Sequence, residues 1–529
     1  MRPILFRRFA LEAILDFNIH IIYLEKNSMG MKSTRRDFLK VTAATGVGYW
    51  VSAGNQRIKA ADANSRLGVA SIGVGGKGGG DCANASRFGD IVGVCDVDKG
   101  TLESAKGTHK NAKGYADFRE MLTDLKDKIE IVTISTPDHM HAPATLMAMR
   151  MGKSCYTQKP MTRTIYEARK MTEVAKEMKV CTQMGNQGSA LNTSRMATAQ
   201  LKAGVLGTLK AVYVWSNRPV WPQAPGRVIT MKKFSDDLEK QVASGRIDAD
   251  EMKEMVDGKK NEVAAALGKV DWNLWLGVAK EREFWPGVYH TFSWRSWWDF
   301  GSGALGDMAC HQVTVPFDGC ELKDPISVVA KTSGHDFDSY PSSSSIHFEF
   351  PETKNRPAIP FYWYDRKGNK PPAEVFEKAG YTDNVNDSGV FIIGEKGAFY
   401  SGDDYCGSYK FTNGIKPIEG LEPEYAENKG NDDVNNMYEL FRAVEANDPM
   451  IAKSNFISRG GPLTETILLG NLAVWAAPKG GEKEGDLGDW GEKIEWDAEN
   501  LKVTNLSSLK TPGVADLIKP TYRGDYKLD

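Results

Sequence analysis

Three side chains of the types that move protons stand out in the sequence: Lys159, Asp307 and His311. Asp307 and His311 lie four residues apart in a Gly-rich segment predicted to enter a helix, so they would share one helix face. On that face the carboxylate would bias the imidazole toward the tautomer that accepts a proton, and His311 would take the proton of a substrate hydroxyl. Lys159 would hydrogen-bond the same oxygen and stabilise its developing negative charge. The simpler alternative is that Asp307 caps the helix and His311 is a hydrogen-bonded core residue.

A glycine-rich loop supplies a candidate nucleotide site. An apolar strand over residues 67–72 runs into the sequence GVGGKG of residues 73–78, which has G-x-G-x-x-G spacing and precedes a helical stretch. Gly73 would permit the tight turn, Gly75 would let the backbone approach a diphosphate, and Gly78 would let the helix pack on the strand. The diphosphate would then lie at a helix N-terminus.

Asp96 ends the next apolar strand, residues 91–95, and lies 18 residues after Gly78. A carboxylate there would accept hydrogen bonds from the adenosine ribose hydroxyls and repel a 2′-phosphate, so the sequence favours NAD over NADP. Gly76 and Lys77 complete the expected cofactor-binding loop. The alternative is a Gly-rich surface turn that holds no ligand.

Strand and helix signals continue to alternate up to residue 184. Strands are expected over 129–135, 154–158 and 180–184, and helices over 142–151 and 165–178. This alternation predicts an α/β Rossmann domain with a parallel doubly wound sheet. Ligands bind such sheets at the carboxyl ends of the strands. The side chains expected to border the cofactor there are those of Thr136, Pro137, His139 and Gln158.

Beyond residue 185 the pattern changes to strands without a helix between each pair. It predicts an α+β domain built on a mostly antiparallel open sheet, with strands over 209–215, 326–332, 345–350, 360–364, 390–394 and 398–400. The charged segment 231–269 is expected to be a helical insertion, either a solvated hairpin or a subunit contact. Two further helices are expected over 434–444 and 463–475.

The predicted organisation therefore has four parts. They are an N-terminal extension over residues 1–63, an NAD-binding domain over 64–186, a substrate and oligomerisation domain over 187–455, and a C-terminal helix and tail over 456–529 that pack back on the sheets. A homo-oligomer through the antiparallel sheet is expected.

Tryptophans are concentrated in the second domain, where eight of the 13 fall between residues 215 and 298. Indole rings stack on the faces of pyranose rings, which makes Trp294 a candidate substrate contact. Arg295, Asn186 and Gln187 are the candidates to hydrogen-bond sugar hydroxyls. Core packing explains the same aromatic residues equally well.

Composition excludes several classes of protein. The chain has 529 residues, 41% hydrophobic and 26% charged, as expected of a globular protein with more than one domain. It has no uncharged apolar run of about 18 residues, which argues against a multispan membrane protein. Seven scattered cysteines without a CxxC pair indicate neither a disulfide framework nor a zinc site.

Charge is divided unevenly along the chain. Residues 1–63 hold ten lysines and arginines against five acidic residues, so the remainder is mildly acidic and a poor partner for nucleic acid. The basic segment includes STRRDFLK at 33–40, an uncharged stretch at 41–54 and Ala61-Asp62-Ala63, a candidate cleavage site. This pattern resembles a twin-arginine signal and predicts export by that machinery to the periplasm or cell envelope. A frayed basic helix is the alternative, and translation could begin at Met31.

Together these motifs resemble the glucose-fructose oxidoreductase and inositol dehydrogenase family (Gfo/Idh/MocA). The resemblance spans residues 66–320 and rests on the G-x-G-x-x-G loop, Thr136-Pro137 followed by His139 and His141, Lys159-Pro160, and Asp307-x-x-x-His311. It implies that Lys159, Asp307 and His311 form the catalytic group. It also disfavours the alternative in which His139, His141, Asp307 and His311 bind a metal.

The sequence departs from the family pattern at two positions. Gln158 stands where a glutamate is common, which puts the nicotinamide contacts in doubt. Thr314 stands where an aspartate often follows the histidine, which puts substrate choice in doubt.

The resemblance implies an exported NAD-dependent oxidoreductase that acts on a secondary alcohol of a sugar, glycoside or polyol. One alternative is an NAD-dependent glycoside hydrolase that acts by transient oxidation and elimination, and another is a non-catalytic nucleotide-binding sensor. Because little free NAD exists outside the cytoplasm, an exported enzyme must keep its cofactor tightly bound.

Overall fold

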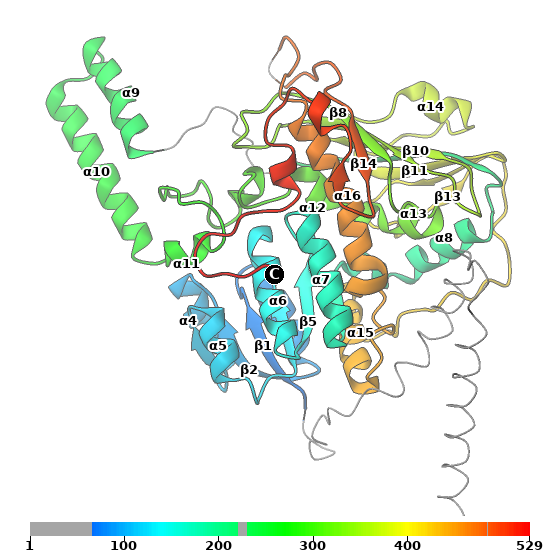
Figure 1. Cartoon of the computed structure of the whole chain (residues 1–529), viewed down its shortest axis with the longest axis horizontal. Coiled ribbons are helices and arrows are strands. Elements are labelled where there is room, and N and C mark those ends of the chain that lie inside the picture. The colour runs from blue at the N-terminus through cyan, green and yellow to red at the C-terminus, as the bar shows by residue number, and fades with distance from the viewer. Residues whose placement is uncertain (1–65, 221–229, 484) are drawn as a thin grey trace, which may run out of the picture. The chain divides into compact units, whose positions relative to one another are not determined.

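The computed structural model describes residues 66–220, 230–483 and 485–529 (Figure 1). The export signal expected over residues 33–63 and Trp221 lie outside the described residues. Among the helices of the described ranges, none combines the length and apolarity that a membrane crossing needs.

The first sheet is parallel and has six strands in the order β3-β2-β1-β4-β5-β6. This is the strand order of a doubly wound dinucleotide-binding fold, so the predicted Rossmann domain is confirmed. Its strands are β1 (Gly68–Ile72), β2 (Asp90–Cys95), β3 (Lys113–Tyr115), β4 (Ile131–Ile134), β5 (Ser154–Gln158) and β6 (Thr182–Gly185).

Helices cover both faces of this sheet. Alternate strand residues point to opposite sides: Val69 and Ile131 join one core cluster, whereas Ala70 and Val132 join the other. In Figure 1 α6 and α7 cross in front of the parallel strands. The helices of this domain are α3 (Lys77–Ser86), α4 (Lys99–Thr108), α5 (Phe118–Asp124), α6 (His141–Arg150) and α7 (Ile165–Met178).

Helix α15 (Asp432–Ala446) packs on the Rossmann domain, although the sequence analysis assigned it to the second domain. Its residues Met437, Leu440 and Phe441 lie in one core cluster with Val69 of β1 and Cys82 of α3. This helix therefore packs with the first domain, although it lies within the stretch expected to form the second. Hydrophobic periodicity predicts which face a helix buries but not which sheet it buries it against.

The second sheet has nine strands in the order β13-β12-β11-β7-β10-β9-β8-β14-β15. Its pairings are antiparallel except for β7 with β10, which confirms the mostly antiparallel prediction. Its strands are β7 (Leu209–Ser216), β8 (Ser327–Thr332), β9 (Ser344–Phe350), β10 (Ile359–Asp365), β11 (Gly389–Gly394), β12 (Ala398–Ser401), β13 (Lys410–Phe411), β14 (Ile494–Asp497) and β15 (Lys502–Val503).

Helix α16 (Gly461–Trp475) packs against α7 of the first domain and against β8 and β9 of the second sheet. It is apolar over most of its length, as expected of a helix buried on several sides. It also supports α12 (Gly303–Gln312): a Cβ at Gly470 would lie 2.5 Å from Cδ2 of Leu305. This close approach fixes the helix that carries Asp307 and His311.

The remaining helices and short turns are divided between the two domains, and η1 belongs to the first because it follows β4. They are α8 (Asn192–Lys202), α11 (Trp272–Leu276), α13 (Thr314–Gly319), α14 (Ala373–Lys378), and the short turns η1 (Asp138–Met140), η2 (Gln187–Ala190), η3 (Ser293–Ser296), η4 (Phe456–Gly460), η5 (Leu506–Ser508) and η6 (Ala515–Leu517). The insertion forms α9 (Met231–Ala243) and α10 (Ala249–Leu267). Leu238 is the only residue buried in either helix, as expected of a solvated hairpin.

The start of α3 makes a stability prediction. A Cβ at Gly78 would lie 2.0 Å from the main-chain oxygen of Gly73, whereas one at Gly80, in the same helix, meets nothing within 4 Å. Gly78→Ala should therefore lower the free energy of unfolding by roughly 1–3 kcal/mol through overpacking. Gly80→Ala should raise it by up to about 1 kcal/mol. Urea unfolding of both variants, with and without added NAD, checks this; equal stability of the two would contradict the packing argument.

Candidate active site

Lys159 and Asp307 form an ion pair between the two domains. Lys159 directly follows β5, and its Nζ donates to Oδ1 of Asp307 at 2.9 Å and to the main-chain oxygen of Asp307 at 2.8 Å. The side chains are only 16% and 14% exposed. Water therefore screens this pair weakly, and each charge depends on the other.

Asp307 stays ionised in this setting. Burial opposes ionisation, but the positive charges of Lys159 and Arg295 outweigh it and lower the pKa of Asp307. Nε of Arg295 lies 3.5 Å from Oδ1 of the same carboxylate. The guanidinium also lies over the ring of Trp294, 4.2 Å from its centroid. Arg295 thus stands beside the candidate catalytic group.

His311 is buried, 3% exposed, one turn after Asp307 on α12. Burial and the charge of Lys159 hold the pKa of His311 well below its ordinary value, so the ring is neutral. Its Nδ1 lies 2.9 Å from Oδ1 of Asn186. The ring of Tyr405 packs edge-on against the imidazole at 4.9 Å.

The expected interaction between Asp307 and His311 is not what the structure shows. The carboxylate turns to Lys159 and Arg295, and the imidazole turns to Asn186. Spacing of four residues brings two Cβ atoms together, but the charge of Lys159 attracts the carboxylate more strongly than a neutral ring does. The expectation that Asp307 biases the His311 tautomer therefore has no direct contact between the two side chains behind it among the described residues.

The glycine loop fits a dinucleotide. Gly73 has φ +75° and a Cβ there would lie 2.7 Å from the oxygen of Ser135, so the tight turn needs glycine. Gly76 also has positive φ, and open space surrounds its Cβ position. Helix α3 starts there without a side-chain cap. The N–H of Gly78 donates to the main-chain oxygen of Gly75 at 2.9 Å, so a diphosphate would meet the other N–H groups of the first turn.

Asp96 lies at the end of β2, where the sequence analysis expected it. Its Oδ2 accepts from the N–H of Val74 in the glycine loop at 2.9 Å, and its Oδ1 accepts from the N–H of Asp98 at 2.9 Å. Burial raises its pKa, whereas these two N–H groups favour the charged form. The carboxylate is thus held in one orientation beside Gly75, whose Cβ position is 3.9 Å from Oδ2.

Lys77 and Gln158 meet at Asp81, a buried residue of α3 that the sequence analysis did not single out. Nζ of Lys77 lies 2.9 Å from Oδ1 of Asp81 and 2.6 Å from Oδ1 of Asp433 on α15. Nε2 of Gln158 donates to Oδ2 of Asp81 at 2.8 Å. An amide at 158 suits this partner, because a glutamate there would place two carboxylates against each other.

Thr136, Pro137 and His141 shape the end of β4. His141 lies between the main-chain oxygens of Thr136 and Pro160, each 2.8 Å from a ring nitrogen, and so contacts the segments that follow β4 and β5. His139 is fully buried, and its Nε2 lies 3.0 Å from the main-chain oxygen of Trp275. His139 therefore packs inside an aromatic cluster, which corrects its placement at the cofactor.

The residues predicted to contact the substrate differ in their surroundings. Asn186 is fully buried with its amide bonded to protein groups, so it does not face a substrate as expected. Gln187 has a buried Oε1 without a partner among the described residues, and its role stays a prediction. Core packing accounts for five tryptophans of the cluster, which are Trp215, Trp275, Trp294, Trp297 and Trp298.

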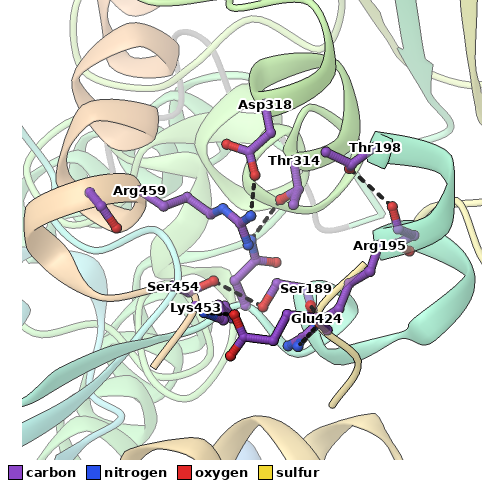
Figure 2. A network of polar contacts seen from close by, with 12 residues as sticks. Ser189, Arg195, Thr198, Thr314, Asp318, Glu424, Lys453, Ser454 and Arg459 are labelled. Atoms are coloured by element: carbon purple, nitrogen blue, oxygen red, sulfur yellow. Dashed lines mark hydrogen bonds and ion pairs between the residues drawn. The ribbon is translucent and has the colours of Figure 1, made fainter. Parts of the chain in front are cut away.

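A polar network lies beneath Asn186. Figure 2 shows Thr314 beside the pair formed by Asp318 and Arg459, and Ser454 close to Ser189. The Ser454 hydroxyl donates to that of Ser189 at 2.9 Å. The segment just before η4 is thereby tied to η2, which packs next to α12.

Asp138 is a further acidic residue of the site that the sequence analysis passed over, although it lies between Pro137 and His139. Burial raises its pKa to about 7. The hydroxyl of Ser302, at the start of α12, donates to its Oδ2 at 2.6 Å. Across the described ranges, no three histidine, cysteine, aspartate or glutamate side chains converge as a metal site would require.

Comparison with known proteins identifies two family domains. Residues 67–186 match a model described as an oxidoreductase family with an NAD-binding Rossmann fold. Residues 241–353 match the C-terminal α/β domain of an oxidoreductase family. The expectation of an NAD-binding domain is confirmed.

Two curated relatives illustrate the similarity. A glycosyl hydrolase family 109 protein of Solibacter usitatus is 27% identical over 195 residues, 34% of this chain and 44% of that protein. The D-glucoside 3-dehydrogenase of Escherichia coli K12 is 30% identical over 158 residues, 29% of this chain and 44% of that protein. The chain thus spans less than half the length of these relatives.

A solved structure shares the fold. The inositol dehydrogenase homologue of Azotobacter vinelandii, complexed with NAD+, aligns over 82% of this chain and 98% of its own length. The TM-score is 0.51 and the sequence identity 14%, which is a likeness of fold.

The raised pKa of Asp138 predicts a pH-dependent stability. Between about pH 4 and 7 the native state holds a proton that the unfolded carboxyl releases, so this contribution to stability is lost as the pH rises through 7. Asp138→Asn removes the titration but keeps an acceptor for Ser302. From pH 5 to 8 the unfolding free energy of the variant, relative to the parent, should improve by roughly 2 kcal/mol. Urea unfolding at both pH values checks this, and parallel pH curves would contradict it.

Proposed function

We propose that the chain, whose residues 67–186 and 241–353 match two models of the Gfo/Idh/MocA oxidoreductase family, is an exported NAD-dependent oxidoreductase acting on a sugar, glycoside or polyol. The observation that carries the proposal is the placement of Lys159, Asp307 and His311. The lysine directly follows β5 of the NAD-binding domain, and the other two residues come from α12, which lies against that end of the strand.

The chain's own residues divide the work of alcohol oxidation. Neutral His311 takes the hydroxyl proton, because its low pKa keeps a lone pair available at neutral pH. Lys159 donates a hydrogen bond to the same oxygen as negative charge develops there. Asp307 holds the ammonium group in place through its 2.9 Å contact.

NAD, when bound, supplies the acceptor for hydride from the alcohol carbon. The residues that would hold it are the glycines of loop 73–78, Asp96 and the end of β4 at Thr136 and Pro137. Lys77 already forms ion pairs with Asp81 and Asp433, so it would contribute its positive charge to the diphosphate site.

Glycosides are the favoured substrate class. The relatives named glycosyl hydrolase family 109 protein and D-glucoside 3-dehydrogenase both point to a sugar ring with a glycosidic bond. The first name also supports a second candidate, in which transient oxidation acidifies a neighbouring C–H, the glycosidic bond is eliminated and hydride returns. Both candidates use the same proton-transfer group.

Aryl glycosides discriminate between these candidates. We expect oxidation to raise the NADH absorbance without release of phenol, and hydrolysis to release phenol without net NADH. His311→Ala should lower kcat of either reaction by roughly 100- to 10,000-fold while NAD affinity changes little. His109→Ala is the matched control, because His109 is half-buried at the end of α4, where its Nε2 lies 3.3 Å from Sγ of Cys82. Near-normal kcat in His311→Ala would refute the assignment.

Export and tight cofactor binding belong to the same proposal. The twin-arginine route carries folded proteins, so NAD can be loaded before export through the signal that starts at Arg35-Arg36. The reduced cofactor would then be reoxidised in place by a second carbonyl substrate or by returning hydride to the same sugar. An oligomer would form through the outer face of the second sheet, where His347, Tyr362 and Tyr213 stack.

Cofactor retention predicts the content of the purified protein. Protein recovered from the cell envelope without added nucleotide should hold close to one NAD(H) per chain and no NADP(H), which mass spectrometry after denaturation measures. Retention over many turnovers needs a submicromolar Kd, which corresponds to a binding free energy on the order of −8 kcal/mol or more favourable. Asp96→Ala should hold less NAD(H) and accept NADP. An empty parent protein that binds NAD only at millimolar concentration would refute retention.

A further inference from the structure

The orientation of the Asn186 side chain is determined by its neighbours. Its Nδ2 lies 2.8 Å from the main-chain oxygen of Cys310 and 2.7 Å from Oγ1 of Thr314. The Cys310 carbonyl can only accept a hydrogen bond, and the Thr314 hydroxyl donates its hydrogen to that same carbonyl at 2.7 Å. Both neighbours therefore require the NH2 group of the amide, and rotating the amide by half a turn would place oxygen against oxygen.

This orientation fixes the proton on His311. The remaining amide atom, Oδ1 of Asn186, faces Nδ1 of His311 at 2.9 Å, and an amide oxygen only accepts. Nδ1 of the neutral ring must then carry the hydrogen, which leaves Nε2 with the lone pair. Nε2 has no hydrogen-bond partner among the described residues and is not among their fully buried, unpaired atoms.

We propose that Asn186 is a positioning residue that selects the Nδ1–H tautomer of His311 and so makes Nε2 the atom that receives the substrate proton. The proposal deepens the proposed function and rests on it for the identity of the proton donor. It assigns to an uncharged amide the task that the sequence predicted for Asp307, whose carboxylate is held by Lys159 and Arg295.

An uncharged partner orients the imidazole but does not strengthen it as a base. A carboxylate against Nδ1–H would stabilise the imidazolium and raise the pKa of the histidine, whereas an amide orients the ring without adding charge. The charged groups whose fields reach His311 are Lys159, Asp307, Lys77 and Arg218, and the ring of Tyr405 packs against it. Among these only Asp307 favours the charged ring.

Asn186→Leu tests the proposal because leucine has a similar shape and no hydrogen-bonding groups. The Cys310 oxygen keeps its bond from Thr314, so among these groups the substitution leaves only the His311 Nδ1–H without its partner. We expect kcat to fall at least about 10-fold with the KM for NAD unchanged. Asn369→Leu is the matched control, since Asn369 donates to Ser344 and Asp365 of the second sheet.

Nitrogen NMR of the holoenzyme labelled at its histidines gives a readout that loss of stability alone does not move. The parent protein should show His311, identified by comparison with His311→Ala, protonated at Nδ1 and unprotonated at Nε2. In Asn186→Leu the Nε2–H form should appear. An Nε2–H ring in the parent, or an unchanged tautomer and kcat in the variant, would overturn the inference.

The NMR experiment needs no substrate, so it separates this inference from the proposed function. If the protein shows the inferred tautomer and yet neither oxidises nor hydrolyses any glycoside, that result supports the role of Asn186 and refutes the proposed reaction. If the parent protein turns over a glycoside but its His311 ring is protonated at Nε2, the proposed function is supported and the role of Asn186 is refuted.

Discussion

The ion pair between Lys159 and Asp307 is the contact on which the site depends. The two opposite charges are held 2.9 Å apart and are largely shielded from water. Lys159 alone would be a nearly buried, uncompensated charge, and Asp307 alone would keep only the more distant Arg295 at 3.5 Å. The pair therefore fixes the end of β5 against α12. Two further contacts support the same arrangement: His141 contacts the segments that follow β4 and β5, and α16 packs against α12.

The first domain was the most predictable part of the fold. Strand β5 and helix α7 have the bounds expected from the sequence, because a buried strand and a capped amphipathic helix carry their signals locally. The capping box of Thr164 and Glu167 marks where α7 begins. The packing partner of a helix is not encoded so locally, and α15, expected with the second domain, packs on the first. The short strands β13, β14 and β15 were missed because two to four residues at a sheet edge carry too little pattern.

The candidate site could be predicted by residue type but not by pairing. The sequence brought Lys159, Asp307 and His311 together, and the structure places them at the junction of β5 and α12. The sequence could not reveal that Asp307 binds Lys159 while Asn186 binds His311, because the four-residue spacing of Asp307 and His311 is the same whichever partner each side chain takes. His139 was misplaced for a related reason: a histidine next to a strand end can point to the ligand or into an aromatic cluster, and only packing decides.

The position of α15 also bears on the order of events during synthesis. The core that contains β1 and α3 is completed by residues near position 440, about 250 residues after the last strand of the parallel sheet. At 5–20 residues per second the ribosome needs roughly 10–50 s to cover that stretch. During this interval the nascent nucleotide-binding sheet exposes an apolar face, so one helix late in the chain determines when the first domain can close and when chaperones must release it.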